Sequence, residues 1–315
     1  MPLSWFVCPL PLTSHSDRFN SLMPAIWGVA VSGMIAFGLP ARAAELISHG
    51  VFYWDEDLAD FGGFSGLAIA DGGATLYAAS DRGELFRAAI ARDGSGRIAH
   101  VETRWQGRFL DNFAQPVDGF TADAEGLAIG ADGTVFVAFE SYARVAGFHP
   151  PDMTPQAESY WDRFRQTWGN EGFEALAIMP DGQFLVIEER PADGVAGYPT
   201  FLGRNGTWVS GPELPVTDDF HAVGADFGPD GMLYLLERRT DLLARFSSRI
   251  RRFAFDGHAF DTGETLLSTE PAALDNMEGI SLWTDAGGRV IVSLISDDNF
   301  LIFQNTLIVE YNLIE

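Results

Sequence analysis

Short apolar runs separated by Gly, Asp and Pro recur along most of the chain, and five stretches share one layout. In each, a short apolar run ends near an Asp-Gly or Gly-Gly pair and a second run rich in β-branched and aromatic residues follows. Asp-Gly between two apolar runs predicts a tight β-hairpin, because both turn positions tolerate positive φ. The predicted hairpins span residues 64–83, 124–145, 173–190, 222–239 and 277–299.

These hairpins repeat at nearly regular intervals. Counted from Ser65 to Glu125, Glu174, Val223 and Glu278, the steps are 60, 49, 49 and 55 residues. A self-similar unit of about 50 residues is typical of radial or solenoid repeats, and four antiparallel strands of this total length make a propeller blade. We therefore predict an all-β propeller of four-stranded blades. A β-sandwich is the alternative fold, but it does not explain the repeat.

The two ends of the mature chain predict how the ring closes. Residues 45–54 and 306–314 both read as strands without a repeat of their own, and pairing them in one blade removes two exposed sheet edges. The hairpins then give five blades, or six if residues 148–170 hold a degenerate one. We otherwise predict a loop there, with a short helix near residues 159–167.

Each predicted hairpin carries charged residues at its open end. In an antiparallel hairpin the start of the first strand lies beside the end of the second, and the first strand of a propeller blade lines the axis. The side chains expected at one mouth of the central channel are Ser65, Asp81, Arg82, Glu125, Glu140, Glu174, Glu188, Glu189, Arg190, Glu237, Arg238, Arg239, Glu278, Asp297, Asp298 and Asn299.

Three interpretations of this cluster remain open. The carboxylates accept backbone N–H groups from neighbouring blades and only hold the ring together. Alternatively they bind Ca²⁺ or Mg²⁺ through hard oxygen ligands, with Glu125, Glu174, Glu278, Asp297, Asp298 and Asn299 as metal ligands. Or one carboxylate with a raised pKa acts as a general acid or base. The candidate catalytic residues are Glu125, Glu174, Glu278 and Asp81, with Arg82 and Arg190 pairing with these acids or binding a substrate anion.

Composition narrows the chemistry. The net charge of −24 disfavours nucleic acid and anionic membranes as partners. All 20 basic residues are arginine, so mechanisms that require lysine are excluded. The sequence has no G-x-S-x-G, H-E-x-x-H, Walker or G-x-G-x-x-G motif, and we expect no organic cofactor. His221 lies close to the predicted mouth, although a lone solvent-facing histidine is the simpler interpretation.

The N-terminal residues resemble an export signal. Arg18, an apolar stretch over residues 25–39 and the sequence Ala41-Arg42-Ala43 form a basic region, a hydrophobic region and a cleavage site. We predict a signal peptide over residues 1–43 and a mature domain over residues 44–315, periplasmic or secreted and not membrane-bound after cleavage. An uncleaved anchor is the alternative, though the apolar stretch is short for a span. The single cysteine, Cys8, lies in this leader.

The repeated motifs resemble those of the phytase-like, esterase-like propeller family. The similar stretches are "FSGLAI…YAASDRG", "DAEGLAI…DGTVFVAFE", "FEALAI…DGQFLVIEER", "DGMLYLLERR" and "NMEGISL…SLISDDNF…QNTLIVEY". They run in order from Leu58 to Tyr311. Two repeats depart from the Glu-Gly pattern, with Ala175 after Glu174 and Val223 in place of the glutamate. Positions that match the family pattern are Asp81, Arg82, Glu125, Glu174, Glu278, Asp297, Asp298 and Asn299.

The resemblance implies a hydrolase of small-molecule esters or phosphoesters. We expect Ca²⁺ or Mg²⁺ held by carboxylates at the mouth to activate water while Arg82 or Arg190 binds the anion. A propeller that binds a ligand or protein without catalysis is the alternative. Because calcium-dependent propeller phytases also use lysine, the absence of lysine argues against direct transfer of their mechanism.

Overall fold

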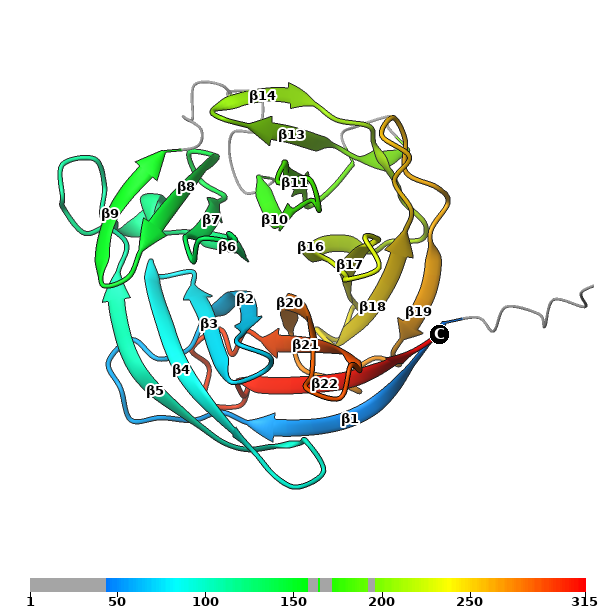
Figure 1. The fold of residues 1–315 in the computed structure, drawn as a ribbon, viewed down its shortest axis with the longest axis horizontal. Helices are drawn as coiled ribbons and strands as arrows, with labels where there is room; N and C mark the ends of the chain where they lie inside the picture. Colours follow the sequence, from blue (N-terminus) through cyan, green and yellow to red (C-terminus); the bar gives the residue numbers. More distant parts are fainter. Residues whose placement is uncertain (1–43, 158–163, 165–171, 192–195) are drawn as a thin grey trace, which may run out of the picture. The chain divides into compact units, whose positions relative to one another are not determined.

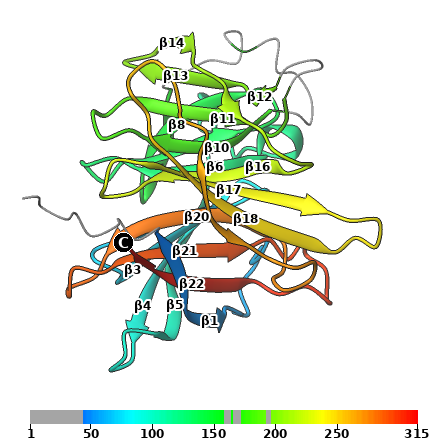
Figure 2. The same cartoon turned by 90° about the vertical axis from the view of Figure 1, so that its right-hand side faces the viewer.

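The structure is a computed structural model that describes residues 44–157, 164, 172–191 and 196–315. Five antiparallel sheets stand around a common axis, as Figures 1 and 2 show in two perpendicular views. The predicted signal peptide lies outside the described residues, and so does the predicted short helix apart from Phe164. Within the part of the chain that the structure describes, no helix has the length and hydropathy needed to cross a membrane.

In four of the blades, the strands follow one another in sequence order from the axis outward. Blade 1 contains β2 (Phe64–Ala70), β3 (Thr75–Ser80), β4 (Glu84–Arg92) and β5 (Ile98–Arg108). Blade 2 contains β6 (Ala124–Ile129), β7 (Val135–Phe139), β8 (Arg144–His149) and β9 (Asp152–Ala157). Blade 3 contains β10 (Phe173–Ile178), β11 (Phe184–Glu188), β13 (Thr200–Arg204) and β14 (Thr207–Ser210). Blade 4 contains β16 (His221–Phe227), β17 (Leu233–Thr240), β18 (Phe246–Phe253) and β19 (Glu264–Ser268).

Blade 5 joins the two ends of the described chain. Its sheet order is β20 (Met277–Thr284), β21 (Val290–Ser296), β22 (Leu307–Ile314) and β1 (Glu45–Tyr53), with β1 and β22 antiparallel from Glu45↔Ile314 to Tyr53↔Leu307. A small sheet of β12 (Gly197–Tyr198) and β15 (Leu214–Pro215) and the 3₁₀ helix η1 (Gly119–Thr121) lie in the connections. The prediction of a five-bladed propeller closed by its terminal strands is thus confirmed.

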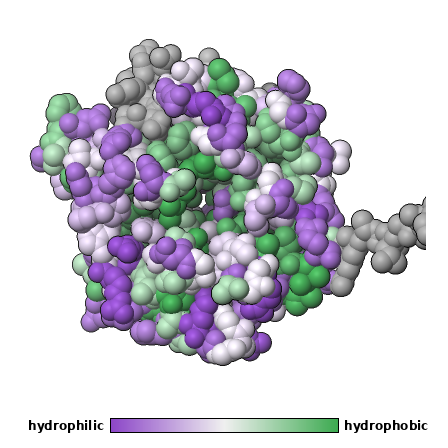
Figure 3. All heavy atoms as spheres, in the orientation of Figure 1, coloured by the Kyte–Doolittle hydropathy of each residue, from purple (hydrophilic) through white to green (hydrophobic). Residues whose placement is uncertain are grey.

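The hydrophobic core is divided into five clusters, one between each pair of adjacent blades. The cluster between blades 5 and 1 contains Phe64 and Phe86 from blade 1 with Trp283 and Ile308 from blade 5. The other four clusters join blades 1 and 2, 2 and 3, 3 and 4, and 4 and 5 in the same way. Burying apolar area between neighbours is what holds a radial repeat together. An opening remains at the centre of the ring (Figure 3).

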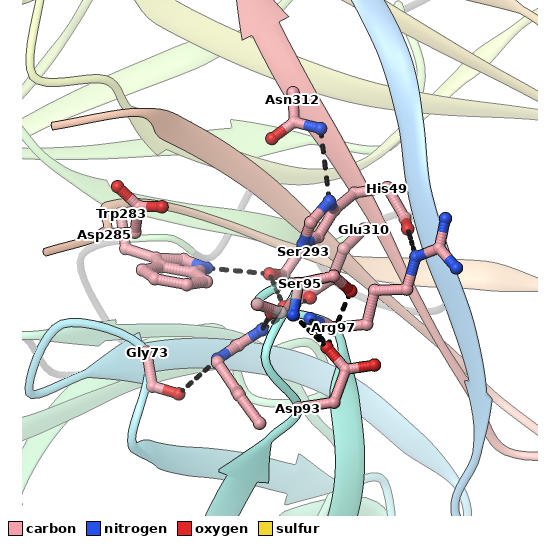
Figure 4. A network of polar contacts seen from close by, with 12 residues as sticks. His49, Gly73, Asp93, Ser95, Arg97, Trp283, Asp285, Ser293, Glu310 and Asn312 are labelled. Carbon is pink, nitrogen blue, oxygen red and sulfur yellow. Dashed lines mark hydrogen bonds and ion pairs between the residues drawn. The ribbon is translucent and has the colours of Figure 1, made fainter. Parts of the chain in front are cut away.

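A polar network, drawn in Figure 4, reinforces the closure between blades 5 and 1. Arg92 in this network donates to the carbonyl of Gly73 in the β2–β3 turn, so the network lies at the end away from the predicted mouth. The buried carboxylate of Glu310 in β22 accepts two hydrogen bonds from the guanidinium of Arg92 in β4, at 2.7 and 2.9 Å. Ser293 donates a third, and its hydroxyl accepts a hydrogen bond from the Trp283 indole. Because these partners satisfy Glu310, we interpret the network as a structural tie rather than a reactive site.

Candidate functional site: a ring of carboxylates at one channel mouth

Every innermost strand has a β-bulge near its start, at the second residue of β2, β6, β10 and β20 and at the third residue of β16. Each hairpin register shifts at this point, and the residues left unpaired are Ser65, Glu125, Glu174, Val223 and Glu278. A bulge bends its strand and changes the direction of the side chain on the extra residue. Five equivalent bulges therefore place one residue from each blade at the same end of the channel, and three of these are glutamates.

The glycine after the bulge explains the Glu-Gly pattern. A Cβ at Gly126 would lie 2.6 Å from the backbone nitrogen of Leu176, and one at Gly224 would lie 2.5 Å from the carbonyl oxygen of Glu278. Neighbouring inner strands approach too closely for any side chain at these points. The glycine thus allows the strands, and with them the glutamates, to come together around the axis.

A second ring surrounds the bulge residues. On the second strand of each blade, one residue pairs with the residue just before the bulge, and the next residue along the chain belongs to this ring. The members are Asp81, Glu140, Glu189, Arg238 and Asp297. The backbone N–H groups of Asp81, Glu140 and Asp297 each donate across the hairpin mouth, at 2.9 Å, to the carbonyl two residues before the bulge. These bonds fix the ends of the first and second strands side by side, as antiparallel pairing predicts.

Glu125 and Glu174 are the least compensated acids of the cluster. Among the described residues, no hydrogen bond or ion pair reaches either carboxylate, and the whole Glu174 residue is only 8% exposed. Burial raises the pKa of Glu125 well above its usual value, and the charges of Glu174 and Asp123 raise it further. Burial also raises the pKa of Glu174, together with repulsion from Glu189, Glu278 and Glu140. Glu174 is buried and Glu125 is half-buried, and the two carboxylates lie close enough to repel each other strongly.

Asp123, Glu125 and Glu140 form a compact triad of oxygen ligands. One carboxylate oxygen from each residue lies within 4.8 Å of the others. Burial raises the pKa of Glu140 to about 8, and its hydrogen bond with Asp123 and the charge on Asp123 add to the effect. Ser141 donates to the other side of Asp123 at 3.2 Å. This spacing of three carboxylates suits a hard divalent cation.

Arg238 is the buried cation of the ring. It is paired with the carboxylate of Glu278 in the next blade, donates to the Asn276 side-chain oxygen at 2.9 Å, and lies 3.7 Å from Glu189. Burial raises the pKa of Glu278 to about 7 although Arg238 lowers it. Burial would lower the pKa of Arg238, but attraction by Glu278, Glu174 and Glu189 raises it overall.

Glu189 interacts with two further basic groups near Arg238. It lies 3.3 Å from Nδ1 of His221 and 3.0 Å from the guanidinium of Arg190. Burial favours a raised pKa, but the His221 hydrogen bond, Arg190 and Arg238 together hold the pKa of Glu189 below its usual value. His221 is thus not a lone surface histidine, and Arg190 is held by a carboxylate of the protein.

The remaining predicted residues of blades 1 and 5 interact with each other and with the adjacent loops. Burial and the charge of Asp297 raise the pKa of Asp81 to about 7, and burial raises that of Asp297 to about 6. Asp298 accepts hydrogen bonds from the backbone of Gly63 and Phe300 and from Thr306. Asn299 is exposed and its side-chain amide donates to Gln304 at 3.3 Å. The Arg82 guanidinium stacks on the Phe300 ring, 3.2 Å from its centroid.

The structure therefore brings together Glu125, Glu174 and Glu278, with Asp81 and Asp297 beside them. Asp298 and Asn299 instead lie in the loop before β22, and within the described part of the chain their hydrogen bonds do not involve the three glutamates. Two contributors, Asp123 and Asn276, were missing from the sequence prediction. Both lie two residues before a bulge glutamate, and His221 occupies the same position in blade 4. That repeated offset was the signal that would have revealed them.

A comparison with models of known protein families shows which family the chain is related to. The family model described as "Phytase-like: Esterase-like activity of phytase" matches residues 59–300, more than half of the sequence. The chain belongs to the phytase-like family. The match confirms the resemblance inferred from the repeated motifs. It begins before β2 and ends at Phe300, so this phytase-like domain includes all five inner strands and the complete ring of carboxylates.

Solved structures resemble the phytase-like domain more distantly. They include a gluconolactonase from Xanthomonas campestris, 13% identical with a TM-score of 0.43, covering 79% of this chain and 72% of that one. Another is a PQQ-bound aldose sugar dehydrogenase from Streptomyces coelicolor, 14% identical with a TM-score of 0.44, covering 84% and 98%. A luciferin-regenerating enzyme is 10% identical with a TM-score of 0.46, covering 83% and 94%. Similarity at this level gives no argument about chemistry. No curated protein matches the sequence.

Proposed function

We propose that this phytase-like propeller is a divalent-cation-dependent hydrolase of esters, acting at the carboxylate mouth of its central channel. The observation that carries the proposal is the pair Glu125 and Glu174. A buried carboxylate without a partner is strongly disfavoured unless it is protonated or meets a cation. Because the two residues stand beside Asp123 and Glu140, a bound cation would relieve the repulsion of four acids at once.

The donor set fits Ca²⁺ or Mg²⁺. Asp123, Glu125 and Glu140 would hold the ion, with Glu174 as the adjacent fourth carboxylate. All four offer hard oxygen atoms, and a divalent charge among them would replace the mutual repulsion of the carboxylates by attraction. A cation bound there would polarise the ester carbonyl and lower the pKa of a bound water.

The chain's own residues supply the proton chemistry. Glu189 holds His221 through Nδ1, while no contact engages its Nε2 within the described residues. An imidazole oriented by a carboxylate and free at its second nitrogen suits a proton acceptor or donor. His221, Arg190 and Arg238 hold the pKa of Glu189 below its usual value, whereas the pKa values of Glu125 and Glu174 are raised, so acids on the two sides of the ring differ in protonation.

The available cations favour a carboxylic ester over a phosphoester. In the described part of the mouth, Arg238 is occupied by Glu278 and Asn276, and Arg190 by Glu189. Arg82 stacks on Phe300, at the side of blade 1. A phosphate approaching this ring would meet mostly carboxylates, which repel it unless cations intervene. The predicted signal peptide supports a periplasmic or secreted location, which we also propose.

The test compares metal-free and metal-loaded protein on p-nitrophenyl butyrate, p-nitrophenyl phosphate and phytate. We expect turnover of the carboxylic ester with Ca²⁺ or Mg²⁺, loss with EDTA, and a decrease of about a hundredfold in Glu125→Gln and Glu174→Gln. Glu102→Gln, which removes an exposed acid paired with Arg104 on β5, is the matched control. If folded protein turns over none of these substrates with any added metal, the propeller is a binding module and the proposal is wrong.

A further inference from the structure

A cleft opens on the mouth side of blade 2, next to the carboxylate triad, and we propose that it binds the apolar alkyl or aryl group of the substrate ester. This inference rests on the proposed function, which it extends from the reacting group to the class of substrate. The cleft has a volume of about 400 Å³ and is lined by Leu110, Val117, Phe139, Arg144, Phe148 and Pro155, among others. Small-molecule sites are commonly this large and mostly apolar.

The floor of the cleft is rigid and aromatic. Phe139 and Phe148 line the cleft, are almost completely buried and lie 6.4 Å apart between ring centroids. Both also pack against the buried Phe109, with centroids at 5.6 and 4.7 Å. They belong to the core cluster between blades 1 and 2. Such edge-to-face and tilted packing fixes ring positions, so the floor exists before any ligand arrives.

The cleft and the triad are built from neighbouring residues of the same segments of the chain. Phe139 on the floor directly precedes Glu140, and Thr121 on the wall lies two residues before Asp123. Arg144 lies between the two regions, with its guanidinium 3.8 Å from the Phe139 ring centroid and hydrogen bonds to the carbonyls of Thr121 and Ser141. Since Arg144 covers the Phe139 ring, a ligand in the cleft would meet Arg144 beside Thr121 and Ser141, which lie within two residues of Asp123 and Glu140.

The charged groups of the cleft differ between its outer and inner parts. Asp111 and Asp118 line its outer part, and they disfavour a negatively charged substituent there. At the inner end, the two carbonyls take two of the five N–H groups of Arg144, which leaves donors for an ester oxygen. Apolar walls with oxygen-binding groups at one end match an ester whose larger substituent is alkyl or aryl.

The experiment separates binding from turnover by using the neutral fluorescent probe N-phenyl-1-naphthylamine and its displacement by p-nitrophenyl hexanoate in the Glu125→Gln variant. We expect the probe to bind wild type and Glu125→Gln equally. Pro155→Trp, which fills the cleft from β9, should weaken binding by about tenfold or more. Val209→Trp changes an exposed residue on the corresponding outer strand of blade 3 and should leave binding unchanged. Asn112→Trp on the loop above the cleft is the second blocking variant if Pro155→Trp does not fold.

Two readouts distinguish failure of this inference from failure of the proposed function. In one outcome, Pro155→Trp or Asn112→Trp weakens probe binding but the protein hydrolyses no ester. This outcome would support the binding cleft and refute the proposed hydrolase. Metal-dependent hydrolysis with the same KM ratio of hexanoate to acetate in wild type and blocking variants would retain the hydrolase and refute the cleft. Absence of probe binding, or equal loss in Val209→Trp, also overturns the inference.

Discussion

Arg238 in blade 4 and Glu278 in blade 5 form an ion pair across the inner edges of two blades. Their side chains are 20% and 8% exposed, so both charges are largely removed from water. The pair also contacts Asn276 and lies near Glu189, which makes Arg238 the common partner of acids from two blades. The cation therefore stabilises the ring that surrounds it, and blade 4 contributes a charge of opposite sign to those of its neighbours.

Replacing Arg238 with Gln should destabilise the propeller by about 3 kcal/mol at pH 8, because removing one partner of a buried pair leaves the other charge uncompensated. The loss should be smaller at pH 5, since the pKa of Glu278 is raised to about 7 by burial even with Arg238 present and its carboxyl is then mostly protonated. Urea denaturation at both pH values measures the difference. Arg190→Gln, at a half-exposed position on the same ring, is the control and should change stability little.

Metal-free protein should become less stable as the pH rises from 5 to 8. Burial raises the pKa of Glu140 to about 8, of Asp81 and Glu278 to about 7, and of Asp297 to about 6. The folded state therefore binds more protons than the unfolded state over this range, and the free energy of unfolding falls with increasing pH. Thermal melts in EDTA measure the trend. A melting temperature that rises steadily from pH 5 to 8 would show that these acids are ionised and compensated.

Added Ca²⁺ or Mg²⁺ should stabilise the protein more at pH 8 than at pH 5, because the cation competes with protons for the same carboxylates. In Glu125→Gln the stabilisation by metal should largely disappear. The metal-free variant should melt at the same temperature as wild type or higher at pH 8, since one half-buried carboxyl group that neighbouring acids repel is gone. Melting curves with and without metal test both points. A Glu125→Gln variant with the full metal shift would place the cation elsewhere.

The fold was predictable because its main signal is periodic. Asp-Gly turns between apolar runs mark each hairpin, and regular steps between Ser65 and Glu278 indicate equivalent blades. The closure by β1 and β22 followed from two strands without repeats and the need to remove sheet edges. Because these features are local or repeated along the chain, a single sequence is enough to detect them.

The site was predictable only in part. Convergence of Glu125, Glu174 and Glu278 follows from strand order, since equivalent positions in a propeller meet at the axis. The contributions of Asp123 and Asn276 depend on a bulge that brings the residue two positions earlier to the same edge. Likewise, the pairing of Arg238 with Glu278 and of His221 with Glu189 depends on distances between blades. Side-chain contacts between different repeats leave no pattern in a single sequence.

The approach of neighbouring inner strands yields a last prediction, for Gly126. A Cβ there would lie 2.6 Å from the Leu176 backbone nitrogen and 2.8 Å from the Leu176 Cβ, so Gly126→Ala must push β10 away from β6. In blade 3 the equivalent residue is Ala175, and the residue facing it by the same repeat is Ala225 rather than leucine or isoleucine. The protein therefore has alanine, Ala175, in place of this glycine at the position where the facing residue, Ala225, is small.

We expect Gly126→Ala to lower the free energy of unfolding by about 1–3 kcal/mol, as overpacking of a tight contact does. Because the displaced strands carry Glu125 and Glu174, the same variant should also weaken stabilisation by Ca²⁺. Gly94→Ala is the matched control, since a Cβ at Gly94 meets no atom within 4 Å. Urea denaturation with and without Ca²⁺ measures both effects. Equal stability and equal metal response in the two variants would mean that strand spacing does not set the geometry of the carboxylates.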